Sequence, residues 1–258
     1  MHPLVNIALR AARDAGETLA LGVDRLDRID IVRDDGDDFV TSMDTHADTT
    51  ILYHLKKAYP EYSIQSRISG LTEGTNPDHR WLVDPVAGSR NYANGHSQFA
   101  VAIACEIEGK VTHAVLLNPL LREEFVASRG SGAQLNARRI RTSANKELTS
   151  ALIGLNPQRL EAERFLSLQR DLLVSGASPR LSGCSALDMA YVACGRLSAG
   201  WCAGGPGADL ATAALILREA GGYVADERGG PDTRAANELI FGNPRLFREL
   251  VKMRARRG

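Results

Sequence analysis

The sequence predicts an α+β protein whose helices and sheets pack in layers, and two patterns lead to this prediction. In the first half, amphipathic helical segments precede a series of short strands separated by turns. In the second half, helical and strand patterns alternate. No linker rich in Pro, Gly or Ser separates the halves, so we expect residues 1–141 and residues 142–258 to pack as one unit.

The first elements are predicted from apolar periodicity. Residues 5–21 carry apolar side chains at helical spacing, which is typical of an amphipathic helix on a core. The acidic run 34–38 interrupts this pattern and favours a solvated loop. A second helix is expected over residues 45–58, closed by Pro60 because proline cannot continue a helix.

Strand patterns dominate the next part of the chain. We expect strands at residues 81–83, 99–107, 111–118 and 124–127, which form an antiparallel meander. Helices are then expected at residues 161–174, 185–194 and 209–220, followed by a strand at 223–225. Residues 152–155 and 215–217 are apolar and are expected in the core.

Composition excludes several classes of function. Thirty-one basic and 31 acidic residues leave a formal net charge of +0, so no global field attracts nucleic acid or an anionic membrane. The four cysteines show no spacing typical of zinc ligands or of a disulfide framework, which favours a reducing compartment. No segment approaches a membrane span, so we expect a cytoplasmic protein. The basic tail, residues 254–257, favours a solvated helix end over a nucleic-acid contact.

The most informative motif is the segment 81–95. Its strand ends in Asp84-Pro85 and is followed by the turn Gly88-Ser89, which brings a carboxylate and free backbone N–H groups to one point. Such a point can hold a metal ion and a phosphate. Related motifs stand at residues 38–44 upstream and at residues 208–214 and 219–222 downstream.

In their order and spacing these motifs resemble the inositol monophosphatase family, over residues 1–248, and most closely its bacterial SuhB type. The resemblance implies an αβαβα layered sandwich that commonly forms dimers. It also implies Mg-dependent hydrolysis of inositol-1-phosphate or a related sugar phosphate, in which carboxylates hold two or three cations.

The resemblance further implies where the site residues stand. Metal ligands are expected at Asp84, the backbone carbonyl of Val86 and Asp209, and catalytic roles at Asp44 and Ser89. Three further ligand carboxylates of the family are substituted here, by Arg67, Ile68 and Ala87. The glutamate that would contact inositol hydroxyls aligns with Cys202.

These substitutions change the charge of the expected site. The family pattern carries roughly −6 at six acidic positions, whereas Asp44, Asp84 and Asp209 against Arg67 carry roughly −2. We therefore expect weak or absent magnesium binding. Two arrangements of Arg67 stay open: it takes the place of the first cation and pairs with Asp84 or Asp209, or it lies on a mobile, exposed loop over residues 66–75.

Phosphate contacts are expected from Gly88, Ser89 and Arg180, with Arg90 as a further source of charge. The competing interpretation is that Ser89 caps a helix. Residual binding of a phosphorylated small molecule therefore stays open. The histidines are scattered singly, and none is proposed as a ligand or a base.

Three functional hypotheses follow. In the first, the chain is a catalytically impaired family member that acts through binding, and the SuhB-type resemblance implies transcription elongation and antitermination factors or RNA polymerase as partners. In the second, it is an active Mg-dependent phosphomonoesterase. In the third, it is a subunit beside an active paralogue; the resemblance itself implies a homodimer.

Overall fold

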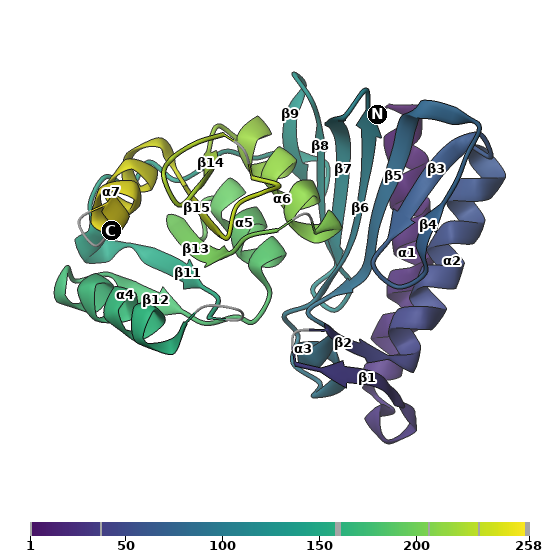
Figure 1. The fold of residues 1–258 in the computed structure, drawn as a ribbon, viewed down its shortest axis with the longest axis horizontal. Helices are drawn as coiled ribbons and strands as arrows, with labels where there is room; N and C mark the ends of the chain where they lie inside the picture. The colour runs from purple at the N-terminus through teal and green to yellow at the C-terminus, as the bar shows by residue number, and fades with distance from the viewer. Residues whose placement is uncertain (1, 37, 158–160, 206, 232, 256–258) are drawn as a thin grey trace.

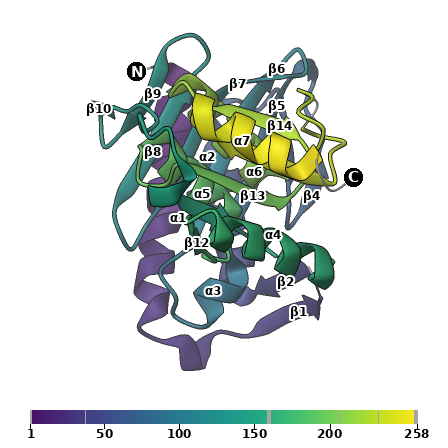
Figure 2. The same ribbon diagram turned by 90° about the vertical axis from the view of Figure 1, so that its left-hand side faces the viewer.

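Five layers of secondary structure make up the computed structural model, which describes residues 2–36, 38–157, 161–205, 207–231 and 233–255. Helices α1 and α2 cover one face of a large sheet, and α5 and α6 lie between that sheet and a smaller one (Figure 1). Helices α4 and α7 cover the outer face of the smaller sheet (Figure 2). The predicted αβαβα sandwich is confirmed.

The N-terminal layer consists of α1 (Pro3–Val23) and α2 (Ser42–Ala58). Both form where the periodicity predicts them, within three residues at each end. Leu9 and Leu19 of α1 and Ile51 of α2 are buried in one hydrophobic cluster with the large sheet. A short 3-10 helix, η1 (Leu26–Arg28), follows α1.

The large sheet has eight strands in the order β10-β9-β8-β7-β6-β5-β3-β4. From β5 to β8 they form the predicted antiparallel meander, which β9 and β10 extend beyond the prediction, whereas β3 pairs with β5 in parallel. The strands are β3 (Tyr62–Ser66), β4 (Gly70–Thr72), β5 (Asn76–Ala87), β6 (Ala100–Ile107), β7 (Lys110–Asn118), β8 (Glu123–Ser128), β9 (Gly132–Leu135) and β10 (Arg138–Arg139).

The smaller sheet has five strands in the order β12-β11-β13-β15-β14. Of the apolar segments predicted for the core, residues 153–155 and 215–217 are buried, and Leu152 is half-buried. The elements of this half are η2 (Leu148–Ser150), β11 (Leu152–Leu155), α4 (Ala162–Val174), β12 (Ser178–Arg180), α5 (Ser185–Ala193), β13 (Ala199–Ala203), α6 (Ala208–Glu219), β14 (Tyr223–Asp226), β15 (Glu238–Gly242) and α7 (Pro244–Ala255). The proposed boundary between halves at residue 141 stays a prediction.

Two segments differ from the sequence-based expectation. The acidic run expected as a loop belongs to a hairpin of β1 (Ile31–Asp35) and β2 (Asp38–Thr41), with Asp37 outside the described residues. Every residue of β1 is exposed, so backbone pairing forms this strand without apolar alternation. Part of the loop expected over residues 66–75 forms the edge strand β4, which pairs with β3.

Other expectations concern the cysteines, the tail and the membrane. Cys105, Cys184 and Cys202 are buried and Cys194 is half-buried, all as free thiols. Residues 256 and 257 of the basic tail lie outside the described residues. Among the helices in the described part of the chain, none is long and apolar enough to cross a membrane.

Candidate functional site

Strand β5 ends in an irregularity that positions the first site residue. Its pairing with β6 shifts between Asp84 and Ala87, which is how a bulge redirects side chains at the end of a strand. The Asp84 carboxylate is 4% exposed and accepts a hydrogen bond from the backbone N–H of Val86 at 3.2 Å. The Asp84 carboxylate therefore lies beside a backbone N–H group at the end of the strand.

Asp44 reaches the same place from the first turn of α2. It forms a capping box with Thr41, whose backbone N–H and hydroxyl donate to Asp44 Oδ2 at 2.9 and 2.6 Å. Asp44 is fully buried, and its Oδ1 faces Ser89 and Arg67. The N-terminus of α2 thus fixes the orientation of this carboxylate.

The guanidinium group of Arg67 lies between these oxygen atoms. Nε donates to Asp84 Oδ1 at 2.9 Å, and Nη2 donates to Asp44 Oδ1 at 2.5 Å, to the carbonyl of Val86 at 3.3 Å and to Ser89 Oγ at 2.9 Å. The side chain is 27% exposed, and Nη1 lies 3.6 Å from Asp38 of the hairpin. Of the two arrangements left open by the sequence, the structure has the inward one, with the predicted pairing to Asp84.

Two differences from that prediction are informative. Arg67 also pairs with Asp44, which the sequence did not indicate, and no ion pair within the described residues joins it to Asp209. Burial by itself lowers the pKa of Arg67, but Asp84 and Asp44 outweigh this effect and raise the pKa above its ordinary value. The guanidinium is therefore a permanent positive charge.

A pair of residues missed by the sequence analysis holds Arg67 in place. The Ser66 hydroxyl donates to Asp48 at 2.5 Å and accepts from the backbone N–H groups of Ile68 and Ser69 at 3.0 and 3.3 Å. Asp48 is 3% exposed and lies one helical turn after Asp44. That spacing on α2 is the signal that could have predicted a second inward carboxylate.

Ser89 is a buried member of this network, and its interpretation as a helix cap is wrong. The helix α3 (Ser89–Ala93) is capped by Gly88 without a side-chain hydrogen bond. Ser89 Oγ instead lies 2.5 Å from Asp44 Oδ1 and 2.9 Å from the carbonyl of Val86. Gly88 has a φ of 94°, and a Cβ there would lie 2.9 Å from the carbonyl oxygen of Gln98, so the turn requires glycine.

The remaining predicted residues occupy different positions. Asp209 stands in the first turn of α6 and is half-buried. Burial and the neighbouring Asp84 raise its pKa to about 6. Arg180 is exposed on β12 and donates to the carbonyls of Ser178 and Pro179. Among the described residues, no hydrogen bond or ion pair connects it to the other residues of the predicted site.

Arg90 was expected to add positive charge near the phosphate contacts. Its guanidinium instead donates to Asp34 and to the carbonyl of Gly36 at 3.0 Å each. At the substituted positions, Ile68 is half-buried and Ala87 is 3% exposed, with its carbonyl accepting from Cys184 Sγ. Cys202 is 1% exposed on β13. Among the described residues, no group of three or more His, Cys, Asp or Glu side chains is arranged to hold a metal ion.

A buried carboxyl group on α5 predicts a pH effect. Asp188 is 2% exposed, and burial raises its pKa to about 7. Between pH 4 and pH 7 the unfolded chain ionises at this position while the folded protein does not, so stability falls as the pH rises through this window. We expect Asp188→Asn to be more stable than the wild type at pH 8, with the advantage shrinking toward pH 4. Urea denaturation at both pH values measures this, and a constant difference would contradict it.

The arrangement leaves few groups free for chemistry. Asp44 already accepts from Thr41, Arg67 and Ser89, which use all its strong acceptor positions. The Ser89 hydroxyl points at two acceptors and receives a hydrogen bond from Arg67. The described network is therefore a closed set of charge-assisted hydrogen bonds around one guanidinium group.

With this fold and these motifs, the chain belongs to the inositol monophosphatase family, and the model of that family matches residues 1–257. The chain is 41% identical to the Nus factor SuhB of Pseudomonas aeruginosa over 258 residues, which cover 97% of this chain and 95% of the relative. It is 36% identical to the Nus factor SuhB of Escherichia coli over 254 residues, again 97% of this chain and 95% of the relative.

Solved structures agree with this assignment. The extragenic suppressor protein suhB of Bartonella henselae superposes with a TM-score of 0.96 at 32% identity, over 100% of both chains. An IMPase of Thermotoga maritima superposes with a TM-score of 0.90 at 26% identity, over 99% of this chain and 98% of that one. The predicted SuhB-type resemblance is confirmed.

Proposed function

We propose that this chain is a catalytically impaired member of the inositol monophosphatase family in which Arg67 takes the place of a catalytic magnesium ion, and that it acts through binding. The observation that carries the proposal is the guanidinium group itself. It donates to Asp44, Asp84 and the carbonyl of Val86, oxygen atoms of the kind that a hard cation requires.

Electrostatics supports this proposal. At about 4 Å and an effective dielectric constant of about 20, a unit positive charge next to a divalent cation costs on the order of 8 kcal/mol. The carboxylates at the positions of Arg67, Ile68 and Ala87 that would offset this repulsion are missing. The donor set in this chain, with a guanidinium group among its oxygen atoms, does not fit Mg²⁺.

Assaying phosphate release tests the proposal. We expect the purified protein to release no more phosphate from inositol-1-phosphate than a protein-free blank, over a range of Mg²⁺ and Mn²⁺ concentrations, because no cation activates water beside Asp84. The Thermotoga maritima IMPase in the same buffers is the positive control. Metal-dependent turnover near that enzyme's rate would sink the proposal and favour an active phosphomonoesterase.

For the binding role, we propose transcription elongation factors or RNA polymerase as partners, in antitermination. Two relatives at 41% and 36% identity over 97% of this chain are Nus factors, which supports this choice. We also propose a cytoplasmic homodimer. Size-exclusion chromatography of the protein alone and with purified RNA polymerase and elongation factors tests both ideas; a monomer that elutes separately from all of them would contradict them.

A further inference from the structure

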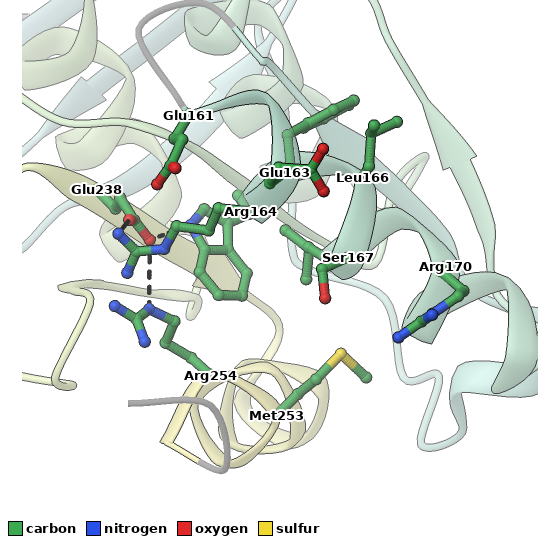
Figure 3. Close-up of a pocket in the computed structure, with 12 residues that line it drawn as sticks. Glu161, Glu163, Arg164, Leu166, Ser167, Arg170, Glu238, Met253 and Arg254 are labelled. Atoms are coloured by element: carbon green, nitrogen blue, oxygen red, sulfur yellow. Dashed lines mark hydrogen bonds and ion pairs between the residues drawn. The ribbon is translucent and has the colours of Figure 1, made fainter.

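A cavity of about 850 Å³ lies on the outer side of the smaller sheet, between α4 and α7 (Figure 3). Trp201 of β13 lines it and packs in the outer hydrophobic cluster, whereas the next residue, Cys202, packs in the inner cluster. Side chains alternate across a strand, so the cavity and helix α6 lie on opposite faces of this sheet. None of its lining residues belongs to the Arg67 network, and its volume is typical of sites for small organic ligands.

One end of the cavity is built around a buried carboxylate. Glu238 of β15 is 2% exposed and accepts from Trp201 Nε1 at 2.9 Å. It also pairs with Arg164 of α4 at 2.7 Å and with Arg254 of α7 at 3.4 Å. Burying a carboxylate is unfavourable unless it is paired, and well-packed apolar residues would stabilise the fold at least as well. Packing alone therefore does not account for this cluster.

The cluster leaves hydrogen-bond donors unused. A guanidinium group carries five N–H donors, and only Nη1 of Arg164 and Nε of Arg254 face Glu238. Nε of Arg254 is buried without a hydrogen bond. Among the described residues, neither arginine has another ion pair or hydrogen bond. Glu238 thus orients two cations from two helices, and together the three groups retain one positive charge.

A third cation and an apolar wall complete the cavity. Arg170 lies six residues beyond Arg164 on α4, about 9 Å along the helix axis. Figure 3 places it on the far side of the cavity from Glu238, and no ion pair or hydrogen bond with it is formed in the described part of the chain. The apolar side chains of Phe165, Leu168 and Met253 also line the cavity.

Two further carboxylates also line the cavity, so the three glutamates and three arginines among its described lining residues balance in formal charge. Glu161 and Glu163 are exposed at the start of α4, where they complement the helix dipole. Exposed charges are strongly screened by salt. Salt therefore screens the two glutamates and also Arg164, whose side chain is 43% exposed, whereas Arg254 is 17% exposed and has the larger influence on a ligand inside the cavity.

We propose that this cavity binds a small amphiphilic anion, which has an apolar body and a carboxylate or phosphate head group. The head group accepts hydrogen bonds from the unused N–H groups of Arg164 and Arg254. The apolar body packs against Phe165, Leu168 and Met253 and is removed from water there. This site is independent of the proposed loss of catalysis.

Four probes with the same apolar body and different head groups test the proposal: decanoate, decyl phosphate, decanol and decyltrimethylammonium. Isothermal titration below the micelle concentration of each probe measures its affinity for the full chain. We expect saturable binding of one or both anions, at least about tenfold tighter than the alcohol or the ammonium compound. Comparing decanoate with decyl phosphate identifies the preferred head group.

Substitutions of the arginines test whether these side chains contribute to binding of the anion. We expect Arg254→Gln to weaken binding of the anion about tenfold and Arg170→Gln about threefold, since Arg164 still neutralises Glu238 in both. Arg248→Gln is the matched control, because it removes an exposed cation of α7 outside the cavity and should leave the affinity unchanged. Equal affinity for all four probes, no saturable binding, or an equal loss in the control would overturn the proposal.

Discussion

Replacing Arg67 with methionine is expected to lower the free energy of unfolding by about 3–5 kcal/mol, because the substitution leaves buried carboxylates without their cation. Asp44 is fully buried and Asp84 is 4% exposed, so neither can recover full hydration. Urea denaturation at neutral pH measures the loss. We further expect added Mg²⁺ to restore part of it in the variant, since the oxygen atoms that Arg67 occupied become available to a cation.

Arg33→Met is the matched control for this experiment. Arg33 pairs with Asp38 on the hairpin, and the two side chains are 47% and 40% exposed. A surface pair of this kind contributes about 1 kcal/mol or less, and no magnesium effect is expected. A loss at Arg67 as small as the loss at Arg33 would mean that the inward guanidinium does not balance the buried carboxylates.

The second large effect is expected from restoring the missing ligands. The triple variant Arg67→Glu, Ile68→Glu, Ala87→Asp removes the fixed cation and introduces the three carboxylates that the family resemblance implies as metal ligands. A metal ion supplies several kcal/mol of transition-state stabilisation, and each ~1.36 kcal/mol is a factor of ten. We therefore expect Mg-dependent phosphate release from inositol-1-phosphate on the order of 10³-fold above the wild type.

Two further variants test which substitutions the gain in activity requires. The variant with only Ile68→Glu and Ala87→Asp retains Arg67, and we expect it to stay inactive because the guanidinium still repels the metal. Adding Cys202→Glu to the triple variant introduces the glutamate that the family resemblance implies as an inositol contact, and this addition is expected to lower KM more than it raises kcat. A folded triple variant without turnover would show that the scaffold has lost more than these ligands.

Apolar periodicity predicted the amphipathic helices, and runs of apolar residues predicted the strands of the antiparallel meander, whose sheet is covered by helices on both faces. The hairpin of β1 and β2 was missed for the converse reason, since β1 is exposed at every residue and carries no apolar alternation. The edge strand β4 also has no buried residue. Such strands depend on backbone pairing with a neighbour, which a local sequence pattern does not encode.

The sequence predicted the backbone positions of Asp84 and Asp44 but left the direction of the Arg67 side chain open. The strand end at Asp84 and the helix start at Asp44 follow from motifs that fix the backbone locally. The direction of Arg67 depends on partners 17 and 23 residues away, and its alternatives differ only in tertiary contacts. The pattern Thr41-x-x-Asp44 is a capping box, and it was the available signal that the Asp44 carboxylate turns toward the start of α2.

Titration of Mn²⁺ into the wild-type protein and into the triple variant, with bound metal followed by electron paramagnetic resonance, tests most directly whether Arg67 stands in for the metal. The account predicts no saturable binding to the wild type at millimolar concentrations and saturable binding to the triple variant. Saturable, tight binding of Mn²⁺ to the wild type would contradict it, because a divalent cation would then share the site with the guanidinium group.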